Sequence, residues 1–168
     1  MLNSTDGLHF QSQRLIGYTS TCSPAQTETS TVLYLAYCSG GLIQVVASGD
    51  GINWSTPTYP SGPQTNATPA LAIYGSDLVV TYFNQFDNEI LVYTAPAILN
   101  LPTPQSSGWT ANQSIAFESV VGGPGLISYN GSLYMGLFNT SDVGNVYTLQ
   151  TGSNGLIDEI SVESLGGR

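Results

Sequence analysis

The sequence predicts an all-β protein, and three features of the chain support this prediction. Hydrophobic residues make up 41% of its 168 residues, which is enough for a buried core. Nineteen Gly and nine Pro, with abundant Ser, Thr and Asn, supply frequent turns. Apolar runs are short, and none shows the sustained 3.6-residue period of an amphipathic helix. We therefore expect many short strands connected by turns.

A repeat of about 45 residues organises the chain. Each of its three copies starts with a small residue followed by proline, at Pro24, Pro69 and Pro124. A first strand and a polar turn follow, and then a second apolar strand, expected at 32–37, 78–83 and 133–138. The third strands are expected at 42–47, 90–94 and 146–150. The second copy is longer because it contains an insertion from Ala95 to Gln105.

A turn motif of the form Ser-x-Asp-Gly-x-x-aromatic follows the third strand of the first copy. It runs from Ser48 to Trp54, and an earlier occurrence runs from Ser4 to Phe10. Less complete versions occur at 106–109 and 151–156. In this motif we expect the Asp carboxylate to accept hydrogen bonds from nearby backbone N–H groups and Gly to adopt a positive φ. We expect the aromatic ring to pack beneath the hairpin.

Four strands in a period of this length are typical of a β-propeller blade. The turn motif resembles the Asp-box (BNR repeat) of sialidases and related propellers, with one residue before Gly missing. The resemblance implies a single, partial propeller domain over 1–168, with four-stranded blades at about 17–59, 60–116 and 117–164. It also implies an extra N-terminal strand at 10–16. The Asp-box residues, to which it assigns a structural role, are Asp6, Asp50, Trp54 and Trp109.

Three blades cannot close a ring, because natural propellers typically have about 4–8 blades. An open ring would expose strand edges and apolar blade faces, which favours association. We therefore expect a homodimer that closes a six-bladed ring, with the N-terminal strand helping to seal the joint. The alternative is that the chain is a fragment of a longer propeller.

The charge balance excludes several functions. The net charge is −9, and the only basic side chains are Arg14 and Arg168. Nucleic acids and anionic membranes are bound through several Lys or Arg, so neither is an expected partner. The sialidases that the motif resembles hold a substrate carboxylate with three arginines, which this chain does not have. We therefore expect no sialidase activity, and the chain is more consistent with a binding protein than with an enzyme.

No metal or cofactor is expected. His9 is the only histidine, and two cysteines without further ligands do not make a zinc site. The stretch from Asp87 to Glu89 offers calcium only loose oxygen ligands. A carboxylate pair for a glycoside hydrolase could form among the eleven Asp and Glu residues, but the sequence identifies none. Hydrolysis is therefore the least favoured function.

The loops at one end of the blades form the expected binding face. In propellers of the class that the motif resembles, the loops after the second and fourth strands lie opposite the Asp-boxes. Aromatic rings can stack there on sugar C–H groups, while Asn and Asp side chains reach hydroxyls. The candidate ligand-binding residues are Tyr18, Tyr59, Asn84, Gln85, Asp87, Glu89, Asn139 and Asp142.

These residues favour a lectin-like protein that binds neutral carbohydrate. The alternative is a structural or protein-interaction propeller subunit. Trp54 and Trp109 could also serve as sugar platforms, but their positions in the turn motif favour packing in the core.

The two cysteines indicate the compartment. Cys22 and Cys38 flank an expected hairpin centred near Ser30, which places them opposite each other on antiparallel strands. We expect a disulfide, with a pair of reduced thiols as the alternative. A disulfide and several Asn-x-Ser/Thr sequons favour an extracellular or cell-surface location. No apolar run is long enough to span a bilayer as a helix.

Overall fold

The predicted all-β class is confirmed by the computed structural model. The structure describes residues 17–60, 68–84, 86–98, 100, 108–116, 122–138, 144–151 and 157–164. These residues form strands and turns and contain no helix. The expected N-terminal strand at 10–16 lies outside the described residues.

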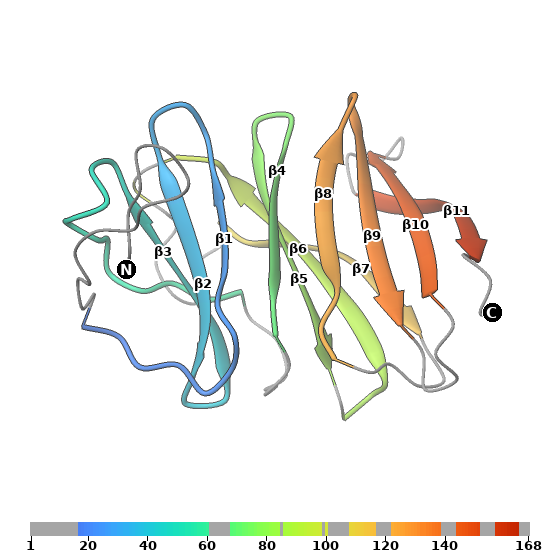
Figure 1. The fold of residues 1–168 in the computed structure, drawn as a ribbon, viewed down its shortest axis with the longest axis horizontal. Coiled ribbons are helices and arrows are strands. Elements are labelled where there is room, and N and C mark those ends of the chain that lie inside the picture. The colour runs from blue at the N-terminus through green and yellow to red at the C-terminus, as the bar shows by residue number, and fades with distance from the viewer. Residues whose placement is uncertain are drawn as a thin grey trace, which may run out of the picture.

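The described strands form three antiparallel sheets, in which each strand pairs with the next one along the chain (Figure 1). Sheet 1 contains β1 (Ala25–Glu28), β2 (Leu33–Ser39) and β3 (Leu42–Ser48). Sheet 2 contains β4 (Ala70–Tyr74), β5 (Asp77–Asn84), β6 (Glu89–Pro96) and β7 (Thr110–Ala116). Sheet 3 contains β8 (Gly125–Tyr129), β9 (Ser132–Phe138), β10 (Gly144–Thr151) and β11 (Ile157–Ser164).

Short turns join the first and second strands of each sheet, as the repeat predicts. The turn between β8 and β9 consists of Asn130 and Gly131, whose φ angles are 50° and 79°. Two consecutive positive φ angles are typical of the tight hairpin turns that match the twist of the flanking strands, and Asn-Gly favours them. The corresponding turns lie at the same end of all three sheets, at the top of Figure 1.

Sheet 1 differs from the expected four-stranded unit. Its described part contains three strands, and the position of a fourth is taken by a segment that pairs with β3 only locally. Val45 and Thr58 exchange backbone hydrogen bonds of 2.7 and 2.9 Å, and the Ser55 N–H donates to the Ala47 carbonyl at 2.8 Å. Pro57 and Pro60 flank Thr58 and have no N–H group to donate. The two prolines therefore prevent this segment from forming a longer ladder of backbone hydrogen bonds with β3.

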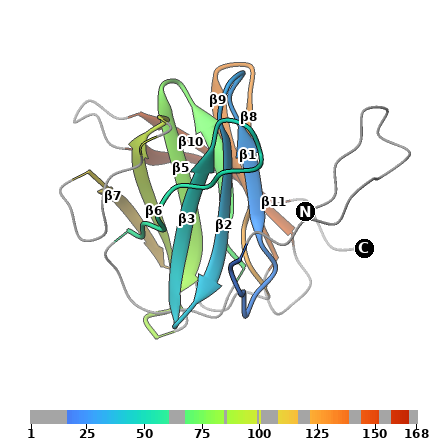
Figure 2. The same ribbon diagram turned by 90° about the vertical axis from the view of Figure 1, so that its left-hand side faces the viewer.

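The three sheets pack face to face in chain order, because strand residues alternate between two apolar faces. One buried cluster joins sheet 1 to sheet 2 and includes Tyr34, Val45, Leu78 and Tyr82. A second joins sheet 2 to sheet 3 and includes Val79, Val92, Met135 and Leu149. The first strands also contact one another in order, β1 with β4 and β4 with β8 (Figure 1). Figure 2 views the same stack from the side of sheet 1.

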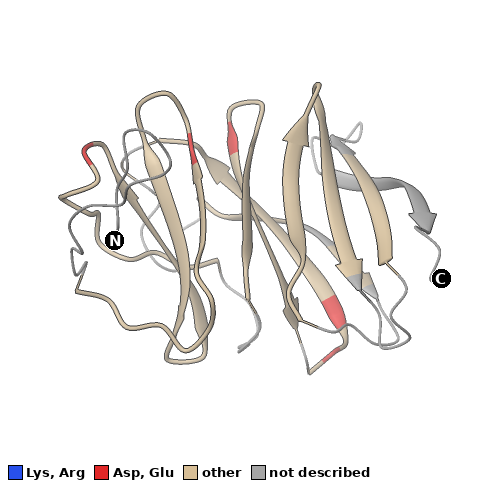
Figure 3. Ribbon diagram, viewed as in Figure 1, with Lys and Arg blue, Asp and Glu red and all other residues tan. Residues whose placement is uncertain are grey.

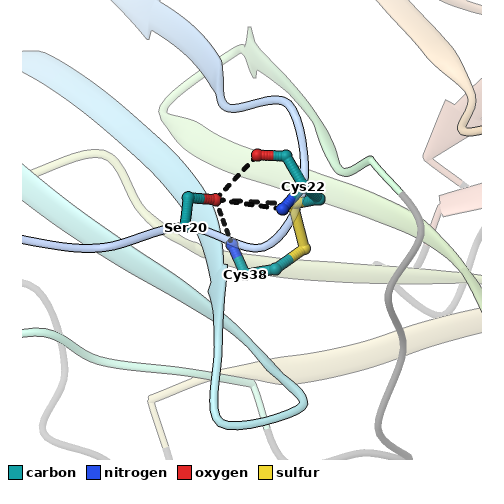
Figure 4. The surroundings of a disulfide bond; sticks show 3 residues. All are labelled: Ser20, Cys22 and Cys38. Atoms are coloured by element: carbon teal, nitrogen blue, oxygen red, sulfur yellow. Dashed lines mark hydrogen bonds between the residues drawn. A yellow bond between two sulfur atoms is a disulfide. The ribbon is translucent and has the colours of Figure 1, made fainter.

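The predicted disulfide is present (Figure 4). Cys22 and Cys38 are bonded, with a Cα–Cα distance of 5.5 Å. Ser20 Oγ accepts hydrogen bonds from the backbone N–H groups of both cysteines, at 3.3 and 3.2 Å, and the Thr21 N–H donates to the Cys38 carbonyl at 3.0 Å. The bond therefore fastens the segment that precedes β1 to the end of β2.

Candidate functional site

The turn after β3 is organised by the Asp50 carboxylate. Its Oδ1 atom accepts hydrogen bonds from the backbone N–H groups of Asn53 at 2.7 Å and Ile52 at 2.8 Å. Its Oδ2 atom accepts a third from the Asn53 side-chain amide at 2.8 Å. These donors, the Asn53 N–H first, lower the pKa of Asp50 well below its usual range. The adjacent Gly51 has a φ of 68°, so the turn has the local geometry expected from the sequence.

Trp54 closes this turn and packs on the outer face of sheet 1, the face that points away from sheet 2. There it joins a cluster with Leu35, Tyr37, Val46 and Tyr18. The Trp54 side chain is half-buried. Its Nε1 atom is buried and has no hydrogen-bond partner among the described residues. The accessible part of the indole is therefore its carbon surface.

A pocket of about 340 Å³ lies beside this ring. Its described lining includes Trp54, Asp50, Asn53, Ser55 and Asn100. Asn100 follows β6 and belongs to the insertion of the second repeat, so the pocket forms where that insertion meets the turn of sheet 1. Its size falls in the range of small-ligand sites, roughly 300–1,000 Å³.

The pocket suits an uncharged polar ligand. The described part of the chain contains no Lys or Arg, and the acidic residues coloured in Figure 3 lie at the turns and strand ends of sheets 1 and 2. The oxygens of Asp50 are committed to the turn, and the Ser55 hydroxyl donates to the Thr56 carbonyl and accepts from the Ala47 N–H. The amides of Asn53 and Asn100 are exposed and offer both donors and acceptors.

Three of the predicted ligand-binding residues lie together away from this pocket, at the turn between β5 and β6 of sheet 2. Asn84 and Glu89 are directly paired where β5 turns into β6. The Asn84 amide nitrogen donates to Asp87 Oδ2 at 2.7 Å, and its oxygen accepts from the Phe86 N–H at 3.1 Å. Asn84 is fully buried. The Asn84–Asp87 contact therefore stabilises the turn. Asp87 is exposed, and Glu89 is half-buried.

Tyr18 occupies a different place. Its ring stacks on Tyr37 with 5.3 Å between ring centroids, and its hydroxyl donates to the Ser55 carbonyl at 3.1 Å. Burial, and then the neighbouring Tyr18, raise the pKa of Tyr37 to about 12. Tyr18 therefore lies in the Trp54 cluster and not with Asn84. Tyr59 is half-buried and follows the Thr58 bridge.

The remaining predicted site residues, Gln85, Asn139, Asp142 and Asp6, lie outside the described residues. Trp109 is 9% exposed and packs between sheets 1 and 2, in the core position that its place in the motif favours. Sequence reasoning missed Asn100, and the only signal that could have suggested it was the additional length of the second repeat.

A comparison with models of known protein families found no match, and neither did a comparison with curated proteins. Within the described residues, no group of three or more His, Cys, Asp or Glu could hold a metal ion. The same part of the chain has no helix with the length and hydropathy needed to cross a membrane.

Proposed function

We propose that this chain is a non-catalytic, lectin-like β-propeller module that binds neutral carbohydrate in the pocket beside Trp54. The observation that carries the proposal is that an aromatic surface and two side-chain amides line the same pocket. A half-buried indole lines a pocket of about 340 Å³ together with the amides of Asn53 and Asn100.

The chemistry of the pocket matches the demands of a sugar. A pyranose ring has an apolar C–H face, which packs on an aromatic surface, and hydroxyls that need both donors and acceptors. Trp54 supplies the surface, while Asn53 and Asn100 supply the polar groups. Because the described chain has no basic side chain, a neutral saccharide suits the pocket better than an acidic one.

The propeller assignment rests on the repeat, on the Asp-box-like turn and on the way the sheets stack. Successive antiparallel sheets pack face to face and their first strands contact one another, as neighbouring blades do in a propeller. The disulfide between Cys22 and Cys38 supports an extracellular or cell-surface location.

Glycoside hydrolysis receives less support from the pocket. That reaction requires two carboxyl groups about 5–10 Å apart on either side of the scissile bond. Asp50 is the sole carboxylate in the described lining, and both of its oxygens are already hydrogen-bonded. The other candidate function, protein interaction, is favoured by two exposed apolar side chains on β8, Ile127 at 61% and Tyr129 at 69% exposure.

A single-tryptophan variant provides the test. The chain contains two tryptophans, so Trp109→Phe leaves Trp54 as the only indole. A glycan array first selects neutral saccharides, and calorimetry and Trp54 emission then measure their binding. We expect binding to change the Trp54 emission, and Asn100→Ala to weaken binding by roughly tenfold, which corresponds to the loss of about one hydrogen bond.

Asn100 is exposed, so its replacement leaves the core intact. Tyr129→Ala is the matched control, because it removes an exposed aromatic ring from sheet 3 and leaves the pocket unchanged. The proposal fails if no saccharide on the array binds, or if Asn100→Ala and Tyr129→Ala bind sugar equally well.

A further inference from the structure

A second pocket, of about 200 Å³, lies beside the one that contains Trp54. One side of it is the hairpin that joins β1 to β2, over residues 28–33. The other side is the turn after β3, which contributes Ser48, Gly49 and Gly51. Gly49 also lines the Trp54 pocket. The two pockets therefore adjoin at this residue, one on each side of the turn.

Both pockets have residues on the same face of sheet 1. Trp54 packs on the outer face, where it joins Leu35 of β2. Leu33 lies two residues before Leu35 on the same strand, so its side chain points to the same face. Glu28 of β1 and Ser48 of β3 are both directly paired with Leu33. Glu28, in the second pocket, therefore shares the outer face with Trp54.

The strand order gives the span of the two pockets. Glu28 and Ser48 lie on the strands that flank β2, and neighbouring strands are about 4.8 Å apart, so their backbones are separated by about 10 Å. The Trp54 pocket extends beyond Ser48, because its lining residue Ser55 is hydrogen-bonded to Ala47 at the edge of β3 that faces away from β2. One pyranose ring is too short to fill both pockets, whereas a chain of several rings can.

The second pocket offers polar groups that suit sugar hydroxyls. Glu28, Ser30 and Thr31 line it and are exposed. A carboxylate can accept hydrogen bonds from two neighbouring hydroxyls of one sugar, and such charge-assisted bonds are stronger than neutral ones. The Thr29 hydroxyl accepts from the Val32 N–H at 3.0 Å and so holds the hairpin in shape. The negative charge of Glu28 disfavours an acidic sugar, as the absence of basic side chains does in the described lining of the Trp54 pocket.

Gly49 leaves the border between the pockets free of a side chain. It is exposed, and its φ is not among the positive ones, so the backbone of the turn does not require glycine there. The earlier copy of the turn motif has Thr5 at the same position. The turn itself is held by the Ser48 hydroxyl, which accepts from the Gly51 N–H at 2.9 Å. The missing side chain therefore keeps a passage open across a preformed turn.

We propose that the two pockets form one extended site for a linear, neutral oligosaccharide that crosses the turn at Gly49. One sugar ring packs on Trp54, and a ring further along the same chain binds Glu28 through its hydroxyls. The extended site depends on the sugar-binding function proposed above, and it makes the ligand an oligosaccharide rather than a monosaccharide. Because both turns are already ordered, each added contact increases the affinity until the two pockets are filled.

A series of sugars of increasing length tests the extended site. The probes are glucose, mannose and N-acetylglucosamine and their β-1,4-linked oligomers of two to four units, whose linkages give extended chains. Calorimetry and the Trp54 emission of Trp109→Phe measure binding. We expect the tetrasaccharide of the series that binds to exceed its monosaccharide in affinity by roughly tenfold or more. Glu28→Gln should reduce this ratio by roughly tenfold, because it removes the charge-assisted bonds, and Gly49→Leu should reduce it by narrowing the passage.

Gly125→Leu is the matched control. Gly125 is also exposed and has no positive φ, but it lies on β8 of sheet 3, so the affinity ratio should stay at its wild-type value. Sugars that change the Trp54 emission but bind no more tightly as the chain lengthens would overturn the extended site and leave the sugar-binding function standing. An undiminished ratio in both Glu28→Gln and Gly49→Leu would do the same. Binding of none of the probes, at any length, would overturn both proposals.

Discussion

Trp109 donates a buried hydrogen bond from its indole Nε1 to the Thr58 hydroxyl at 3.1 Å, across 51 residues of sequence. Trp109 precedes the last strand of sheet 2, and Thr58 belongs to the short segment that bridges to β3 of sheet 1. Both side chains are almost completely buried. The bond therefore connects the start of the last strand of sheet 2 to the segment that takes the place of a fourth strand in sheet 1.

Replacing Thr58 by Val should destabilise the protein by about 1–3 kcal/mol, because the isosteric change leaves the buried Trp109 N–H without an acceptor. Trp109→Phe removes the donor, so adding Thr58→Val to it should cost less than Thr58→Val alone. Urea denaturation of the two single variants and the double variant measures the coupling free energy. We expect a value of about 1 kcal/mol, and additive effects would show that the bond contributes nothing.

Gly123→Ala should disturb the packing of sheet 2 against sheet 3. A Cβ atom at Gly123 would collide with the backbone carbonyl of Thr68. A backbone carbonyl cannot rotate out of the way as the end of a flexible side chain can. We expect a loss of about 1–3 kcal/mol in the free energy of unfolding, measured by denaturation. Gly136→Ala is the control, since its Cβ would meet nothing within 4 Å, and it should be neutral or slightly stabilising.

The Asp50 turn predicts a stability difference that depends on pH. Since the folded-state pKa lies below the unfolded value of 3.8, ionised Asp50 stabilises the fold above about pH 4. This contribution disappears as the pH falls through the folded pKa. Thermal melting should therefore show Asp50→Asn less stable than wild type at pH 7, and the gap should narrow below pH 4. Asp77→Asn removes the same charge from an exposed position and controls for net charge.

Removing the disulfide should lower the free energy of unfolding by roughly 3 kcal/mol, as expected for a closed loop of about 15 residues. Cys22 and Cys38 are 16 residues apart in sequence. The double variant Cys22→Ala, Cys38→Ala should show this loss in urea denaturation. Reductant should destabilise the wild type and leave the double variant unaffected. Equal stability of the two proteins without reductant would contradict the prediction.

Local sequence patterns predicted much of the fold. Short apolar runs after a polar turn located the second strands of all three sheets, and the small-residue–proline pairs marked where each repeat begins. Asn130-Gly131 specified a tight turn through its own backbone preferences. The pairing of Cys22 with Cys38 followed from the same hairpin register. All these features depend on neighbours within a few residues or on one hairpin.

The candidate site depended on contacts that no local pattern encodes. Asn84 has the polar side chain expected of a ligand-binding residue, but Asp87 and Phe86 occupy its amide. Trp54 was expected in the core, and only the approach of Asn100 from another repeat turns its free surface into the side of a pocket. Such contacts are set by tertiary packing and by the length of an insertion, neither of which a sequence period reveals.

The two prolines around Thr58 also affect solubility. A strand at the edge of a sheet normally offers a row of free backbone donors and acceptors to which another molecule can add. Along β3 the chain covers part of that row with its own segment, and Pro57 and Pro60 cannot donate hydrogen bonds to an incoming strand. Only 8% of the residues are charged, so few edge positions carry a charged side chain, and at β3 the covering segment guards against edge-to-edge aggregation instead.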